Sequence, residues 1–180
     1  NPRNVKIAGG SVRGDLDHLS AALAFRAAGE DPRLLAYVPY DAGGKALAGF
    51  LTGEGDVLST GLGEVLEYHR SGRLRIIAVS SPERTAIAPS VPTYRELGID
   101  FEFVNWRGFF AAPGIPDEVA EQYSAILEQM MSTPEWEALR SRNGWQNLFL
   151  DRQEFALFLE QQEQEISNLL IDLGFLRAQQ

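Results

Sequence analysis

Residues 5–29 read VKIAGGSVRGDLDHLSAALAFRAAG, a short apolar run joined to a longer amphipathic run by a glycine-rich turn. The first run predicts a β-strand over residues 5–9. Apolar residues then recur at helical spacing, as at Leu19 and Leu23, which predicts a helix over residues 16–28. The stretch is therefore a strand, a loop and a helix, the repeating unit of an α/β fold.

The same rhythm continues to about residue 100. Further strands are predicted over residues 34–40, 56–60 and 74–80, with a helix over residues 62–70. Short strands that alternate with helices indicate a parallel sheet covered by helices, so the predicted fold class is α/β.

The composition changes after residue 81. Prolines mark a loop over residues 81–93. Aromatic side chains crowd residues 100–112, which predicts a strand that crosses between two bodies. Helices are predicted over residues 117–131, from Thr133-Pro134 onward, and over residues 151–173. The apolar stripe of the last helix needs a partner surface.

The charge and composition exclude several classes of protein. A net charge of −9 argues against a general affinity for nucleic acid or anionic membranes. There is no cysteine, and His18 and His69 lie far apart, so no metal or cofactor is expected. No apolar run reaches the length of about 18 residues that suggests a membrane span, and NPRNVKIAGG lacks the pattern of a signal peptide. Because Asn-Pro leads directly into a strand, we expect that an N-terminal part is missing.

The loop over residues 10–15 is a candidate anion site, because N–H groups at the start of a helix are unpaired and the helix dipole favours negative charge. It lacks the glycine spacing of a dinucleotide loop and of a lipase-like nucleophile elbow. Residues 13–15 spell RGD, a tripeptide that recurs by chance. An ordinary turn and an anion site both stay open. We expect His18 to pack or hydrogen-bond beneath this loop.

Two further strand-to-helix junctions have the same character. VPYDAGGKAL contains Gly43 and Gly44 but is not a nucleotide-binding P-loop, since Ala46 stands where Ser or Thr would bind Mg²⁺. LSTGLGEVL places Ser59 and Thr60 at the carboxyl end of a strand, the edge at which open α/β sheets bind ligands. We expect the three junctions to converge on one small anion.

Six segments, taken in order, resemble the extracytoplasmic solute-binding proteins of tripartite tricarboxylate transporters: GGSVRGDLDHL, YVPYDAGGKALAGFLTGEGDVLSTG, EYHRSGRLRIIAVSSPER, VPTYRELGID, NWRGFFAAPGIPDE and NGWQ. The resemblance implies a type II periplasmic-binding-protein fold, a Venus flytrap of two α/β domains that closes over a small carboxylate. Residues 1–103 resemble the second domain, with its parallel sheet nearly complete. Residues 104–180 resemble the crossing segment and the C-terminal helical part of the first domain, whose N-terminal part has no counterpart here.

The resemblance also implies which residues bind the ligand, through main-chain N–H groups of the loop and through other residues of the cleft. They are Gly10, Ser11, Val12, Arg13, Gly14, Asp15, Tyr40, Gly43, Gly44, Thr60, Trp106 and Arg107. Many relatives carry Ser or Thr where this chain has Asp15, whose charge competes with an anionic ligand unless it points away as a cap. Trp106 and Arg107 also fit a second interpretation, interdomain packing beside an exposed guanidinium.

We therefore predict a periplasmic, non-enzymatic receptor that delivers a mono-, di- or tricarboxylate to the membrane permease subunits of a transporter. No base, nucleophile and oxyanion site occur together, so no catalytic residue is assigned. Two alternatives stay open: an enzyme acting on a small carboxylate or phosphate ester, and the ligand-sensing domain of a signalling system. The apolar faces of the C-terminal helices predict that the 180-residue chain forms a homodimer or derives from a longer chain.

Overall fold

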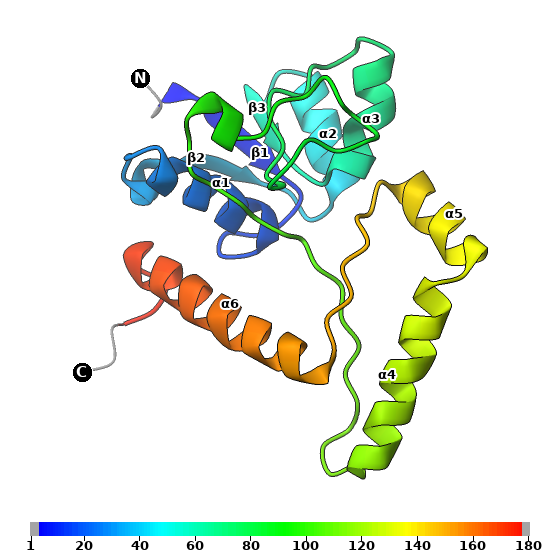
Figure 1. Ribbon diagram of the computed structural model, residues 1–180. Helices are drawn as coiled ribbons and strands as arrows, with labels where there is room; N and C mark the ends of the chain where they lie inside the picture. Colours follow the sequence, from blue (N-terminus) through cyan, green and yellow to red (C-terminus); the bar gives the residue numbers. More distant parts are fainter. Residues whose placement is uncertain (1–3, 178–180) are drawn as a thin grey trace. The chain divides into compact units, whose positions relative to one another are not determined.

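The computed structural model describes residues 4–177, so the outer ends of the two predicted domains lie outside the described residues. The elements, in chain order, are β1 (Lys6–Gly9), α1 (Leu16–Ala27), η2 (Pro32–Leu34), β2 (Ala36–Pro39), α2 (Gly43–Leu51), β3 (Val57–Ser59), α3 (Leu62–Arg70), η3 (Arg95–Leu97), α4 (Asp117–Met131), α5 (Pro134–Asn143) and α6 (Arg152–Asp172) (Figure 1). They form two compact units, one of residues 4–105 with 165–177 and one of residues 106–164. The helix α6 contributes to both units.

The sheet of the first unit has β1 at its centre. It is parallel, with the order β2-β1-β3, and Ile7 of β1 pairs with Tyr37 of β2 and with Val57 of β3. Ile7 and Ala8 are buried, as expected for a strand covered on both faces. Because the strands are parallel, their carboxyl ends and the loops that follow lie along one edge. The first three predicted strands are confirmed, each with shorter bounds.

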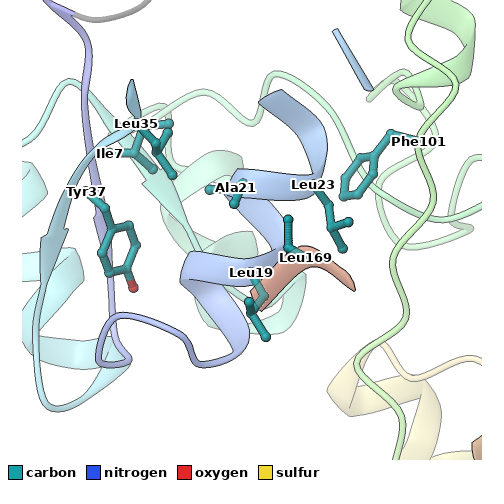
Figure 2. Close-up of a cluster of buried hydrophobic side chains, with 9 residues drawn as sticks. Ile7, Leu19, Ala21, Leu23, Leu35, Tyr37, Phe101 and Leu169 are labelled. Carbon is teal, nitrogen blue, oxygen red and sulfur yellow. The ribbon is translucent and has the colours of Figure 1, made fainter. Parts of the chain in front are cut away.

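A hydrophobic core joins this sheet to α1 and to the end of α6. Ile7 and Tyr37 from the sheet, Leu19 and Leu23 from α1, and Leu169 from α6 belong to one buried cluster (Figure 2). Leu169 is 0% exposed. The end of α6 therefore packs with the sheet of the first unit.

The predicted strand over residues 74–80 is wrong. Among the described residues, this segment forms an isolated parallel bridge between Val79 and Thr93 and no longer ladder. The N–H of Val79 donates to the carbonyl oxygen of Pro92 at 3.0 Å, and its carbonyl accepts the N–H of Tyr94 at 3.2 Å. Pro92 has no N–H to extend the pairing, so the two segments form a single bridge and not a longer ladder.

The predicted strand over residues 100–112 is wrong as well. The segment has no assigned strand, although its first part is anchored: the N–H of Phe103 donates to the carbonyl of Ser80 at 3.0 Å, and the Ser80 hydroxyl donates back to the Phe103 carbonyl at 2.8 Å. Aromatic residues favour strands because they pack well in a sheet. Within the described residues, no neighbouring strand pairs with this segment.

The second unit is helical, its helices begin at or within one residue of the predicted positions, and α4 also ends where the sequence predicts. The Thr133 hydroxyl oxygen accepts the N–H of Trp136 at 3.2 Å and caps α5, whose first residue is Pro134. Gly144 ends α5 with a φ of 69°, a left-handed conformation that glycine adopts without strain. Neither α4 nor α5 contains a buried residue. No helix in the described part of the chain has the length and apolarity needed to cross a membrane.

Candidate functional site

The loop between β1 and α1 is a tight turn closed by glycine. The N–H of Asp15 donates to the carbonyl of Val12 at 3.2 Å. Gly14 has a φ of +87°, in the region that side chains disfavour. The Asp15 carboxylate then accepts the N–H of Leu16 at 2.7 Å, so it acts as a cap at the start of α1.

The inner side of this loop is held by side chains from α1 and β2. The N–H of Gly10 donates to the Asp17 carboxylate at 2.7 Å, and the N–H of Asp17 donates to the Ser11 hydroxyl at 3.1 Å. The Tyr37 hydroxyl donates to the Ser11 carbonyl at 2.9 Å, and the Arg13 guanidinium donates to the Tyr37 carbonyl at 2.6 Å. These bonds tie both ends of the loop to the sheet and to α1.

Three consecutive N–H groups of the loop remain available. Among the described residues, none accepts a hydrogen bond from the main-chain N–H of Ser11, Val12 or Arg13. Gly10 and Gly14 donate within the protein, to Asp17 and to His18 at 3.0 Å. The donors that the loop can offer to a ligand are therefore those of residues 11–13.

The first and second junctions meet at Gly10 and Gly43. A Cβ atom at position 10 would lie 2.8 Å from the carbonyl carbon of Ala42 and would collide with the backbone of Gly43. Gly43 begins α2, whose first turn has no side-chain cap. Only a residue without a side chain allows this approach of two backbones, so glycine at position 10 brings the start of α2 to the loop.

The third junction joins the group through Glu64. The Thr60 hydroxyl donates to the Glu64 carboxylate at 2.7 Å, and a Cβ at position 43 would lie 3.1 Å from the carboxyl carbon of Glu64. The Ser59 hydroxyl donates to the Asp17 carbonyl at 3.0 Å. The three junctions therefore meet at one sheet edge, and their convergence on one small anion stays a prediction.

Four further predicted residues have surroundings of their own. The side chain of Tyr40 runs along α2, where its hydroxyl donates to Glu54 at 2.6 Å and its ring leaves no room for a Cβ at Gly49. Gly44 lies in the first turn of α2, with open space where a side chain would be. Trp106 and Arg107 belong to the second unit.

The Trp106 ring packs within the second unit against aromatic side chains of α6. It contacts Phe155 and Phe158 edge-on, with centroid distances of 5.4 and 5.8 Å. Arg107 donates to the Trp106 carbonyl at 3.1 Å. Packing is therefore the role that the geometry of Trp106 supports.

Sequence reasoning missed Tyr37, Asp17 and Glu64 at this site. Tyr37 had a signal in the alternating pattern of this segment, since Leu35, directly before β2, and Tyr37, in β2, are both buried in the same cluster. Asp17 and Glu64 are acidic residues in the first turns of their helices, a common pattern that does not announce contact with a distant loop. The hydrogen bonds from Gly10 to Asp17 and from Thr60 to Glu64 depend on the folded geometry of the loops.

The electrostatics of the loop are mixed. Burial is the main reason that the pKa of Asp17 lies above its usual range; the Gly10 N–H lowers the pKa, and the negative charges of Glu64 and Asp15 raise it further. Burial lowers the pKa of His18, and the Arg13 guanidinium adds to that effect. The candidate anion site thus has carboxylates nearby, which raise the importance of its N–H donors.

The raised pKa of Asp17 implies that the protein loses stability as the pH rises from acid to neutral. Replacing Asp17 with asparagine is expected to make this loss smaller. Because the folded-state pKa of Asp17 is raised, the folded state binds this proton more tightly, and the free energy of unfolding falls as pH rises through that pKa. Asparagine cannot ionise and keeps an oxygen that can accept the Gly10 N–H. Urea unfolding at pH 4 and pH 7 measures the difference.

Asp56 provides the matched control for this variant. Its exposed carboxylate also accepts a backbone N–H, that of Lys6 at 2.8 Å. Asp56→Asn, measured in the same way, shows what the same substitution does at an exposed carboxylate that also accepts a backbone N–H. A change for Asp17→Asn no larger than the change for Asp56→Asn would contradict the role of Asp17 burial.

Comparison with known proteins places the chain in a family. The family described as "Tripartite tricarboxylate transporter family receptor" matches residues 5–175. A Pseudomonas sp. protein, "UPF0065 protein in tcbD-tcbE intergenic region", is 29% identical over 137 residues, which is 75% of this chain and 40% of that protein. Protein BugT of Bordetella pertussis is 34% identical over 83 residues, 46% of this chain and 26% of BugT.

Solved structures share the fold. The R. palustris protein Rpa4515 with adipate has a TM-score of 0.79 at 20% identity, over 97% of this chain and 57% of Rpa4515. MatC from Rhodopseudomonas palustris with bound malate has a TM-score of 0.68 at 24% identity, over 94% of this chain and 57% of MatC. The chain thus spans less than three fifths of these solved structures.

The match to the family covers nearly all of the described residues, and the similar structures are solute-binding proteins rather than enzymes. The fold predicted from the resemblance is confirmed by these structures, in which the parallel sheet and its helices recur. The chain belongs to the receptor family of the tripartite tricarboxylate transporters, whose members are periplasmic solute receptors.

Proposed function

We propose that this chain forms part of a periplasmic receptor for a small carboxylate, and that the loop between β1 and α1 binds one carboxylate group of the ligand. The observation that carries the proposal is the row of three available N–H groups at Ser11, Val12 and Arg13, in the loop that leads into α1. Hydrogen bonds from such donors to an ionised acceptor are stronger than those between neutral groups. They replace the water that the ligand loses on binding.

The start of α2 supports the same site. Gly10 and Gly43 lie in backbone contact, so the uncapped first turn of α2 is next to the loop. Two helices thus begin at the same sheet edge, and each adds the positive end of its dipole. Gly43, Gly44 and Thr60 are proposed to line this wall of the cleft.

The ligand class follows from the donors and from the relatives. Similar receptors hold adipate in one case and malate in another, both of which carry two carboxylate groups. The proposal for this chain is a small mono-, di- or tricarboxylate, delivered to the permease subunits of a tripartite transporter. The predicted division of the chain at residues 103 and 104 into two receptor domains, and a ligand contact by Arg107, belong to this proposal as well.

A thermal-shift and calorimetry screen tests the proposal with the protein expressed from its complete gene. Adipate, malate, citrate, glutamate and benzoate serve as probes, and the neutral diamide of adipic acid serves as control. Binding to the native state raises the melting temperature, and at 100 times Kd the stabilisation is about 2.7 kcal/mol. A response to at least one carboxylate but not to the diamide is expected. Equal responses to both, or none at all, would overturn the proposal.

Asp15→Ser is expected to tighten carboxylate binding by about 0.5–1 kcal/mol. The variant removes a negative charge beside the proposed site and keeps a hydroxyl that can cap α1 as the carboxylate does now, at 2.7 Å from the N–H of Leu16. Titration calorimetry with adipate at low ionic strength measures the change.

Asp151→Ser is the matched control for this charge change. Asp151 caps the start of α6, where its carboxylate accepts the N–H groups of Gln153 and Glu154 at 2.8 and 2.9 Å. This variant should leave the affinity unchanged. Weaker binding by Asp15→Ser would show instead that Asp15 accepts a hydrogen bond from the ligand.

A further inference from the structure

His18 lies buried beneath the loop, in the first turns of α1. It is 3% exposed, which confirms the prediction that it packs under the loop. The Tyr37 ring of β2 meets it edge-on at a centroid distance of 4.8 Å, and Phe175, which follows α6, meets it at 6.0 Å. A ligand in contact with the loop would therefore not touch the imidazole itself.

One hydrogen bond connects this imidazole to the loop. The N–H of Gly14 donates to Nδ1 of His18 at 3.0 Å. A backbone N–H can only donate, so Nδ1 carries no proton and the neutral ring holds its proton on Nε2. Protonation of Nδ1 would set two hydrogens against each other and break this bond.

Gly14 is the residue at which the loop turns, with its φ of +87°. The available N–H groups of residues 11–13 come immediately before it. The conformation that presents these three donors therefore depends on how Gly14 is held. His18 holds it from below, through the N–H group.

We infer that His18 is a positioning residue for the ligand: its neutral imidazole fixes Gly14, and through Gly14 it fixes the N–H donors of residues 11–13. The inference rests on the proposed function of the loop. His18 thus raises the affinity for the ligand without touching the ligand. This contribution depends on pH, because it requires the neutral imidazole.

The groups around His18 favour its neutral form. Arg13, in the loop, is the charged group whose field acts on the ring, and it disfavours a second positive charge. Tyr37 faces it from β2 with a hydroxyl bonded to Ser11, and Phe175 faces it from the segment after α6. Asp15 and Asp17, at the start of its own helix, are engaged with Leu16 and Gly10. Because burial, and then the Arg13 charge, lowers the pKa of His18, the Gly14 bond persists at neutral pH and is lost only under acidic conditions.

Two substitutions separate the hydrogen bond from the packing. His18→Asn places an amide oxygen where Nδ1 lies, so it keeps an acceptor for the Gly14 N–H and cannot titrate. His18→Leu fills much of the same space without an acceptor. Affinities are measured at pH 7.5 by calorimetry with adipate and with malate, on the protein from its complete gene. His18→Leu should bind these ligands about three- to tenfold more weakly than the original protein. His18→Asn should bind them about as tightly as the original protein.

The pH dependence is read as a ratio of affinities. At pH 7.5 the ratio of the affinity of the original protein to that of His18→Asn should be close to one. As the pH is lowered, the ratio should fall over the range in which ¹⁵N NMR shows the His18 ring becoming protonated, because the ionisation of the ligand and of all other groups cancels in the ratio. A ratio that stays constant while His18 becomes protonated would overturn the inference. Circular dichroism and melting temperature at each pH show that the variants are folded.

His69 supplies the matched control. Its Nδ1 also accepts a backbone N–H, that of Ile76 at 3.3 Å, but it lies on α3 away from the loop. His69→Leu should leave the affinity and its pH dependence unchanged. If His18→Leu binds adipate and malate as tightly as His69→Leu does, the positioning role is refuted while the proposed function stands.

A measurement without ligand tests the bond itself. In ¹⁵N NMR at pH 7.5, the imidazole signals of His18 are identified as those that disappear in the His18→Asn variant. In the original protein these signals should show an unprotonated Nδ1. The Gly14 amide signal of the original protein should lie downfield of the same signal in His18→Leu. A protonated Nδ1 would overturn the inference. If this bond is observed but the original protein binds no carboxylate, the proposed function fails. The positioning role then fails too, because there is no ligand to position donors for, although the bond itself is present.

Discussion

Gly14→Val is expected to weaken carboxylate binding about a hundredfold or more, with a modest loss of stability. Gly14 has a φ of +87°, and a β-branched side chain is strongly disfavoured there wherever the neighbours lie. The nearest atom to a new Cβ is a methyl group of Leu170 at 3.8 Å, so backbone strain and not collision is the cause. Strain relief would turn the loop and misplace at least two charge-assisted donors, at about 1.5 kcal/mol each.

Gly53→Val separates this effect from the strain itself. Gly53 follows α2 with the same φ of +87°, has open space around a new Cβ, and takes no part in the loop. Both variants should lose about 1–2 kcal/mol of stability in urea unfolding, because the left-handed conformation costs about that much. Calorimetry with adipate should detect a change in affinity for Gly14→Val alone. Unchanged binding by Gly14→Val would remove the loop from the site.

The elements that the sequence predicted correctly are those with a complete local signal. The start of α5 has its cap at Thr133 and its proline at the first helical position, and both signals lie within the segment itself. The core strand β1 reads as a short apolar run ahead of a glycine turn. Such signals act over a few residues, so one sequence suffices to predict them.

The two strands predicted wrongly depend on partners far away in the sequence. Residues 74–80 are largely apolar, as in a buried strand, yet the segment beside Val79 contains Pro92, which cannot donate. Residues 100–112 have the aromatic residues of a strand, and no strand lies beside them among the described residues. A pattern of apolar residues specifies a suitable face but not a neighbour that can complete the ladder.

The candidate site divides in the same way. The glycines of the loop and the packed position of His18 could be predicted, because a turn before a helix restricts both. Which N–H groups of the loop remain available to a ligand could not be predicted from the sequence. The N–H groups of Gly10 and Gly14 are consumed by Asp17 and His18, and these pairings exist only once the turn has closed.

The end of α6 offers the second large effect, this time on stability. Leu169→Ala is expected to lower the free energy of unfolding of the first unit by about 2–5 kcal/mol. Leu169 is 0% exposed and belongs to the cluster with Leu19 and Leu23 of α1 (Figure 2), so truncation leaves a cavity in the core that supports the loop. Urea unfolding measured by circular dichroism gives the loss.

Leu157→Ala is the control on the same helix. Leu157 is 60% exposed, so the same truncation removes little buried surface, and alanine is at least as good a helix former as leucine. Its effect should stay within about 0.5 kcal/mol, as for most surface substitutions. Since α1 carries both the core residues Leu19 and Leu23 and the anchors Asp17 and His18, Leu169→Ala should also loosen the loop and weaken adipate binding. Equal, small losses of stability for the two variants would mean that the end of α6 does not pack on α1, and that the loop is supported by the sheet alone.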